Sequence, residues 1–224
     1  MLVEGEDDAG IYRWLEHQLG IFAGNILICS GRNVLISIYQ GRDSFPHGKL
    51  AWFADLDMWR FSTPPDDLAG IIFTSGYSIE NDLYAGSDIE SLMDAAERSQ
   101  HSRLLAAACR WFAFEIHEFR AGREHKCATH IKRVVDLATF DIATAFVKSR
   151  GFTESAPGLV TDLTADYKLQ LRGKTLLEVL LVFLSDSSRG SKYSHRAVIE
   201  MYLKLYPNNP YIQRIITEAK ARLA

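Results

Sequence analysis

Residues 2–8 constrain the fold most, because they place a carboxylate directly after a short apolar run. They read LVEGEDD, which predicts a buried strand ending at Glu4, a tight turn at Gly5 and a helix that follows. A strand that feeds a helix in this way belongs in a parallel sheet, and open parallel sheets bind ligands outside the carboxyl ends of their strands. We therefore expect Glu4 to lie at a ligand-binding edge.

Three further apolar runs predict the rest of this sheet, and they cover residues 25–29, 49–54 and 70–74. The first of them is continuously apolar, which is typical of a strand covered on both faces. Helical patterns at residues 9–19 and 33–40 separate the first three strands, whereas a short linker containing prolines separates the last two. This order predicts a small parallel sheet with right-handed crossovers.

The remainder of the chain has mainly helical periodicity, at residues 89–98, 102–120, 130–150, 174–184, 194–205 and 210–223. We therefore predict an α/β fold, with a small Rossmann-like parallel sheet and a helical C-terminal portion. The predicted division is a core at residues 1–85 and a helical portion at residues 86–224. Packing against the sheet, substrate binding and partner binding are the roles open to the helical portion.

The composition of the 224-residue chain is ordinary for a globular protein, with 47% hydrophobic and 24% charged residues. Its formal net charge of −3 counts against a simple nucleic-acid-binding module, which is usually basic. An enzyme that acts on nucleic acid is still compatible with this charge, because metal ions and a local basic patch can offset the acids.

The cysteines and apolar runs indicate a cytoplasmic protein. Cys29, Cys109 and Cys127 are odd in number and widely spaced, so reduced thiols are the simplest interpretation. The apolar run at residues 176–184 is too short to span a bilayer, and we expect no membrane partner. The first strand begins at Met1, which leaves open whether further residues precede it.

Four carboxylates are expected to meet at the ends of the first and third strands. Glu4 and Asp8 flank the first turn, while Asp55 and Asp57 are two positions apart and point the same way if the chain is extended there. Such a cluster repels itself unless cations neutralise it, and Mg²⁺ is the usual ion for oxygen ligands, with Mn²⁺ as an alternative. The structural alternative is that these acids favour a helix N-terminus or solvate a loop.

These motifs, in this order, resemble the Toprim domain of topoisomerases, bacterial primases and OLD-family nucleases, over roughly residues 2–82. Two further segments are residues 77–83 (YSIENDL) and 172–177 (RGKTLL). They resemble Toprim-like nuclease subunits that accompany ABC-type ATPases in phage-defence operons, such as those of PARIS-type systems. The resemblance implies a Toprim-like fold and a Mg²⁺-dependent endonuclease that cleaves RNA, such as tRNA, or DNA. It also implies an ABC-type ATPase partner, and it leaves a homodimer open.

The resemblance also implies roles for individual metal ligands. Glu4 would be the catalytic acid or base, or a metal ligand. Asp55 and Asp57 would hold Mg²⁺, and Asp8 would help to bind a second ion.

Two further positions acquire implied roles from the same resemblance. Glu80 follows the fourth strand and would add a metal ligand, unless it only caps a helix. Lys174 would contact the scissile phosphate or stabilise charge in the transition state, unless it is a solvated lysine at a turn.

Basic and aromatic residues alternate in two stretches of the helical portion, as they can on a nucleic-acid surface. One stretch covers residues 120–126. The other contains Trp111 and Phe112, whose helical spacing favours a place in the core. Two other functions stay open: a non-catalytic Toprim-like protein-interaction module, and a different metal-dependent phosphoryl transferase.

Overall fold

The sheet of the computed structural model is small, parallel and four-stranded. The structure describes residues 1–5, 9–20 and 25–224. Within these residues the strands run in the order β2-β1-β3-β4, all parallel, and they are β1 (Leu2–Val3), β2 (Leu27–Ile28), β3 (Trp52–Ala54) and β4 (Ile71–Phe73). The predicted α/β class and the predicted small parallel sheet are confirmed, although each strand is shorter than its apolar run.

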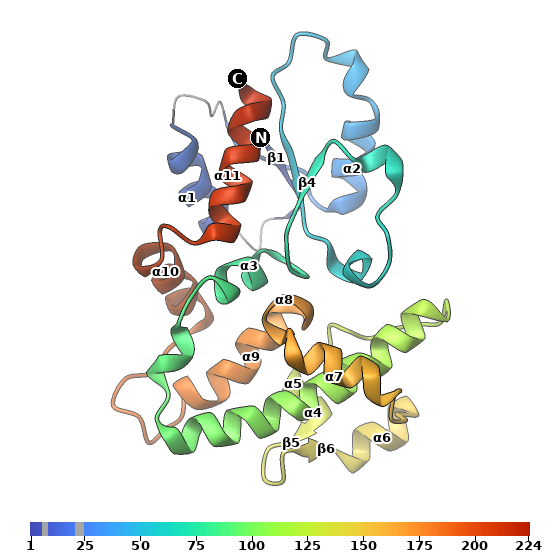
Figure 1. Cartoon of the computed structure of the whole chain (residues 1–224), viewed down its shortest axis with the longest axis vertical. Helices are drawn as coiled ribbons and strands as arrows, with labels where there is room; N and C mark the ends of the chain where they lie inside the picture. The colour runs from blue at the N-terminus through green and yellow to red at the C-terminus, as the bar shows by residue number, and fades with distance from the viewer. Residues whose placement is uncertain (6–8, 21–24) are drawn as a thin grey trace.

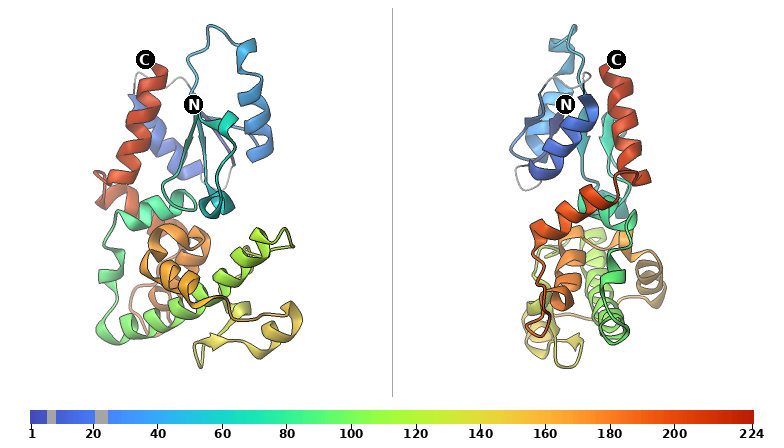
Figure 2. Two further views of the ribbon diagram at one scale, coloured as in Figure 1. Left: turned by 45° about the vertical axis from the view of Figure 1, so that its right-hand side comes forward. Right: turned by 90° about the vertical axis from the view of Figure 1, so that its left-hand side faces the viewer.

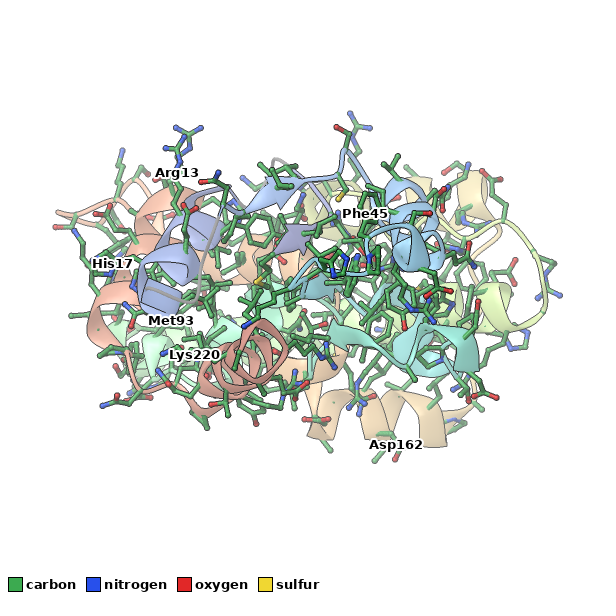
Figure 3. The ribbon with its side chains drawn as sticks, turned by 90° about the horizontal axis from the view of Figure 1, so that it is seen from above. Arg13, His17, Phe45, Met93, Asp162 and Lys220 are labelled. Carbon is green, nitrogen blue, oxygen red and sulfur yellow. The ribbon has the colours of Figure 1, made fainter. Side chains whose placement is uncertain are left out.

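Helices cover both faces of this sheet (Figure 1). On one face lie α1 (Ala9–Leu19) and α11 (Pro210–Leu223), and on the other lies α2 (Arg32–Gln40). Seen from above in Figure 3, α1 with Arg13 and α11 with Lys220 lie side by side. The final helix of the chain therefore returns to the sheet and packs against α1.

Alternation of side chains along the strands separates the two cores. Val3 and Phe53 point into the large core that contains α1 and α11, whereas Leu2 and Trp52 point into a smaller core with α2. Successive residues of a strand face opposite sides of a sheet, so a run that is apolar throughout fits a strand covered on both faces. This explains why β1 and β3 read as continuously apolar.

β2 departs from that expectation, and its predicted burial on both faces is wrong. Leu27 and Ile28 are 56% and 38% exposed. β2 pairs only with β1 among the described strands, so it forms an edge of the sheet. An apolar run in the sequence does not distinguish an edge strand from a central one.

Apart from α11, the helical portion lies beyond the end of the sheet at which the strands finish (Figure 2). The helices at this end are α3 (Ile79–Ala85), which closes the predicted core, and then α4 (Ala95–Arg120), α5 (Ile131–Val134), α6 (Thr144–Arg150), α7 (Pro157–Ala165), α8 (Tyr167–Gln170), α9 (Gly173–Leu184) and α10 (His195–Leu205). Single 3-10 turns occur at η2 (Arg42–Ser44), η3 (Asp57–Phe61), η4 (Asp66–Leu68) and η5 (Ile89–Leu92). The long helix α4 packs against α7 and α9, and Trp111 and Phe112 are fully buried in it, as predicted.

The predicted helix at residues 130–150 is wrong. This segment contains α5 and α6 separated by two short antiparallel strands, β5 (Val135–Asp136) and β6 (Asp141–Ile142). The turn between the strands places Phe140 in the left-handed region, with φ of 56°. The helical patterns at residues 89–98 and 102–120 were also divided incorrectly, because Asp94 caps α4 through its bond from the Glu97 amide and the helix runs on unbroken.

The segment after β4 joins the sheet to the helical portion. The Tyr77 amide donates a hydrogen bond to the Leu169 carbonyl at 2.8 Å. The fully buried Asn81 side chain donates to two further carbonyls of the α8 region, Lys168 at 2.8 Å and Leu171 at 2.7 Å. The two segments that carry the closer family resemblance, residues 77–83 and 172–177, therefore lie against each other.

Gly173 permits this close approach. A Cβ atom at Gly173 would lie only 2.3 Å from the Ser78 hydroxyl oxygen and 2.8 Å from the Asn81 amide oxygen. Only glycine lets the start of α9 sit this close to the start of α3.

None of the described helices combines the length and the apolar character that crossing a bilayer requires.

Asp82 holds the turn between β4 and α3 in the buried core. Its carboxylate accepts hydrogen bonds from the Ser75 amide at 3.0 Å and the Gly76 amide at 2.7 Å, and it lies 4.0 Å from the Arg214 guanidinium. Burial raises the pKa of Asp82 from its ordinary value of 3.8 to about 6, and these bonds and Arg214 only partly oppose the rise. The folded protein therefore binds this proton more tightly than the unfolded chain does.

This raised pKa predicts a stability that falls as pH rises. The contribution of Asp82 is fully present below pH 3.8 and is lost as pH rises through about 6. Since one pKa unit corresponds to about 1.4 kcal/mol, we expect the wild type to lose about 3 kcal/mol more than Asp82→Asn from well below pH 3.8 to well above pH 6. Urea unfolding across this pH range measures the difference, and identical slopes for both proteins would refute it.

Candidate active site

A cavity of about 230 Å³ opens where the strands of the sheet end. It collects all the described residues that the sequence predicts for the site, namely Glu4, Asp55, Asp57, Glu80 and Lys174. The remaining lining residues are Gly5, Tyr12, Gly31, Tyr77, Ser78 and Arg172. The predicted ligand Asp8 lies outside the residues that the structure describes.

Neighbouring strands bring the acids together. Glu4 follows β1 and Asp55 follows β3, and these two strands are paired in parallel, with Val3 opposite Phe53. Parallel strands that are in register end at the same edge, so residues that follow them share one cavity. Glu4 and Asp55 were expected to meet at the ends of their strands, and in the structure both line this cavity.

Asp57 reaches the cavity by a route that the sequence did not reveal. The chain after β3 is not extended, because Asp57 begins the 3-10 turn η3 and has a φ of 46°. The expectation that Asp55 and Asp57 point the same way along an extended strand is therefore wrong, although both line the cavity. A left-handed conformation costs a non-glycine residue about 1 kcal/mol, and such strain clusters at functional sites. A hydrogen bond from the Asp57 amide to the Tyr77 carbonyl, at 2.7 Å, holds it in place.

Asp55 is anchored to the start of a helix. Its Oδ1 accepts a hydrogen bond from the Ile79 amide, the first residue of α3, at 2.9 Å. A carboxylate at a helix N-terminus is favoured by the unpaired amides and the helix dipole. This bond also connects the end of β3 to the segment that carries Glu80.

Arg32 lies between the acids and pairs with two of them. Its Nε donates to Glu4 Oε1 at 2.9 Å, and its Nη2 lies 2.8 Å from Asp57 Oδ2 and donates to the Asp55 carbonyl at 2.6 Å. The guanidinium also lies 4.7 Å from the ring centre of Trp59. Arg32 therefore supplies positive charge inside the cluster of carboxylates.

Burial dominates the electrostatics of this cluster. Desolvation raises the pKa of Glu4, and it also raises the pKa of Asp57, although Arg32 opposes the rise in both. Burial acts to lower the pKa of Arg32, but the charges of Asp57 and Glu4 outweigh it, so that pKa is raised. The two carboxyl groups are therefore easier to protonate than exposed acids, and acids shifted by burial and a charged partner in a cavity are candidates for a functional site.

Glu80 is the most deeply buried acid of the cavity, with 2% exposure. Its Oε2 accepts a hydrogen bond from the Ser78 hydroxyl at 2.5 Å, but its Oε1 has no hydrogen-bond partner among the described residues. The cap of α3 is Ser78, which forms a capping box with Asn81, so Glu80 is not the capping residue. A buried carboxylate oxygen without a partner is costly, and a cation or a donor from a ligand would satisfy it.

Two basic side chains face the acids from the helical portion. Arg172 directly precedes α9, and Lys174 is the second residue of that helix. Both line the cavity, and both act to lower the pKa of Asp57 through space. The start of α9 therefore adds positive charge and helix-terminal amides, which together suit a phosphate group.

The sequence did not identify Arg32 as a partner of the acids. One feature of the sequence could have indicated this pairing. Arg32 is the first residue of the helix that follows β2, so it lies at the same edge of the sheet as Glu4 and Asp57. Recognising the pairing also requires the strand order, because β2 lies next to β1.

The carboxylates that line the cavity are of the chemical type that binds a hard divalent cation. Carboxylate oxygens are the ligands of Mg²⁺ and Mn²⁺, and the unpartnered Oε1 of Glu80 is one such oxygen. Within residues 1–5, 9–20 and 25–224, however, no three acidic, histidine or cysteine side chains are grouped as a metal site. Arg32 accounts for part of this, because it takes up the oxygens of Glu4 and Asp57.

No family model, curated protein or solved structure matches this chain, so the cavity has to be interpreted from its own residues.

Proposed function

We propose that this chain is a metal-dependent nuclease that hydrolyses phosphodiester bonds in nucleic acid. The observation that carries the proposal is a single cavity at the carboxyl edge of a parallel sheet, lined on one side by acids and on the other by Arg172 and Lys174. The acids can bind divalent cations, and the cations together with the basic side chains can bind a phosphate group. The metal-binding and the phosphate-binding residues therefore line the same cavity.

The residues suited to hold Mg²⁺ or Mn²⁺ are Glu4, Asp55, Asp57 and Glu80. Bound divalent ions would supply Lewis acidity and a more acidic water at the phosphate. The carboxylate oxygens of Glu4 and Asp57 that pair with Arg32 are the same oxygens that would bind a cation. The two acids would therefore have to break their ion pairs with Arg32 before they bind the metal.

The chain's own residues would orient the substrate and move protons. Lys174 and Arg172 would bind the non-bridging oxygens of the scissile phosphate and offset its charge. Glu4 has a raised pKa, which favours exchange of a proton with the attacking or the leaving oxygen. Arg32, once released, would stay within reach of the same phosphate.

The biological role that the resemblance implies stays a prediction. It consists of a phage-defence effector controlled by an ABC-type ATPase, acting on RNA such as tRNA or on DNA. A homodimer also stays open as an assembly.

One observation favours the alternative, a non-catalytic Toprim-like interaction module. Arg32 forms ion pairs with both Glu4 and Asp57, as the central residue of a structural ion-pair network would. In that case the acids would stabilise the edge of the sheet, and the helical portion would serve as the interface.

Cleavage assays separate the two functions. Purified protein is incubated with total RNA and with plasmid DNA, in Mg²⁺, in Mn²⁺ and in EDTA, with calorimetry of metal binding in parallel. Cutting that requires a metal supports the nuclease. Absence of both cutting and metal binding would leave the interaction module as the better function.

Competition between Arg32 and a cation gives a prediction that does not depend on activity. In Arg32→Ala the freed carboxylates should bind Mg²⁺ more tightly, so Mg²⁺ should raise the melting temperature more than it does in the wild type. At one hundred times its dissociation constant, a bound ion adds about 2.7 kcal/mol, which is about 5–10 °C for a chain of this size. Thermal melts in Mg²⁺ and in EDTA measure this.

The matched control is Arg42→Ala, which removes a surface guanidinium that bonds to the Tyr39 carbonyl and lies over the Tyr39 ring, away from both cavities. Its response to Mg²⁺ should equal that of the wild type. If Arg32→Ala responds no more strongly than Arg42→Ala does, Arg32 does not compete with a cation.

A further inference from the structure

A second, larger cavity adjoins the candidate active site. Its volume is about 530 Å³, and it shares Asp57, Tyr77 and Arg172 with the first cavity. The guanidinium of Arg172 has no hydrogen bond or ion pair with any described residue, and it lines both cavities. The shared residues make the two spaces neighbours, so one ligand can extend from the acids into the second cavity.

The walls of the second cavity combine rings with positive charge. The rings belong to Trp59, Tyr77, Phe119 and His125. Phe119 and His125 meet edge to face with centres 5.4 Å apart. Phe119 is half-buried and His125 is exposed, so both rings are accessible from the cavity.

Three cationic residues accompany these rings, namely Arg32, Lys126 and Arg172. Asp57, at the border with the first cavity, is the only carboxylate among the described lining residues. Aromatic faces with several cations suit a planar base that carries a phosphate, because bases stack on rings and phosphates pair with cations.

We propose that this second cavity binds one unpaired nucleoside next to the scissile phosphate. Its volume lies within the range of small-molecule sites. A base inside a duplex is covered by its stacked neighbours and cannot enter, so the substrate would be single-stranded or would have a base turned out of its helix. This inference rests on the proposed nuclease function, and it adds that the substrate is unpaired at the cleavage site.

Binding experiments in EDTA test the proposal without cleavage. Fluorescence anisotropy compares a labelled single-stranded oligonucleotide with a blunt duplex of the same sequence, as RNA and as DNA. The single strand should bind more tightly, and Phe119→Leu, which keeps apolar volume but removes the ring, should weaken it about 5- to 100-fold. Duplex binding should change little.

Two further variants control for folding and for position. His125→Ala changes an exposed ring and should weaken single-strand binding without disturbing the core. Phe45→Ala removes an aromatic side chain that is 53% exposed in the loop before β3, and it should bind as the wild type does. Equal binding of single strand and duplex, or unchanged binding by both ring variants, would overturn the proposal.

The outcomes separate this inference from the nuclease function. Metal-dependent cutting that is unaffected by Phe119→Leu and His125→Ala would keep the nuclease and overturn the nucleoside site. Ring-dependent binding of single strands without any cutting would keep the nucleoside site and overturn the nuclease.

Discussion

Replacing Glu4 with glutamine is expected to lower metal-dependent cleavage by at least about 100-fold, the range in which loss of a general acid or base falls. Glutamine keeps the shape of the side chain but cannot carry a negative charge or exchange a proton. It would therefore weaken the hold on a cation and remove the proton acceptor together. Rates of cleavage by wild type and Glu4→Gln, at saturating Mg²⁺ and with the same substrate, measure the effect.

The fold should survive this change. Glu4 lies at the end of β1 with its side chain 16% exposed, and its ion-pair partner Arg32 keeps its second ion pair, with Asp57. Asp43→Asn is the matched control, since Asp43 is an exposed acid in η2 and does not line the cavity. A cleavage rate of Glu4→Gln within a few-fold of the Asp43→Asn rate would show that Glu4 has no part in the reaction.

The sequence predicted where the acids gather because strand ends follow a simple rule. Apolar runs that stop at Glu4 and at Asp55 predict the same edge of a parallel sheet, and no side-chain geometry is needed for that step. The route of the chain beyond the strand was not predictable in the same way. The left-handed backbone of Asp57 depends on a hydrogen bond to Tyr77, which comes from another part of the chain.

The pairs that complete the site are long-range, and a single sequence carries little information about them. Arg32 meets Glu4 only because β2 lies beside β1, and the strand order is a property of the assembled sheet. The error at β2 has the same cause, since Leu27 and Ile28 look as apolar as a central strand but lie at an edge. Burial is decided by neighbours that local periodicity does not specify.

The helical portion supplies residues that line the candidate active site. Arg172 directly precedes α9 and Lys174 lies within it, yet both line the same space as Glu4 and Asp55. The predicted division at residue 85 therefore separates residues that the candidate active site brings together.

The contact between the two portions centres on Asn81, and its replacement should have the largest effect on stability. Its amide group donates to the Lys168 and Leu171 carbonyls. Its carbonyl oxygen accepts from the Ser78 amide at 3.0 Å and, at 3.1 Å, shares the hydrogen of the Ser78 hydroxyl with Glu80. Alanine would remove all four bonds and leave buried polar groups without partners. At about 1 kcal/mol for each bond, Asn81→Ala should lose about 4 kcal/mol.

That loss corresponds to a melting temperature lower by about 8–16 °C for a chain of this length. Asn33→Ala is the control, because Asn33 is exposed on α2 and should change stability by less than about 0.5 kcal/mol. Asn81→Asp tests the donors separately: its carboxylate can still accept from Ser78, but it faces the two carbonyls without a hydrogen to donate. Asn81→Asp should therefore be at least as unstable as Asn81→Ala, and a stability near that of Asn33→Ala would show that the two portions do not depend on this residue.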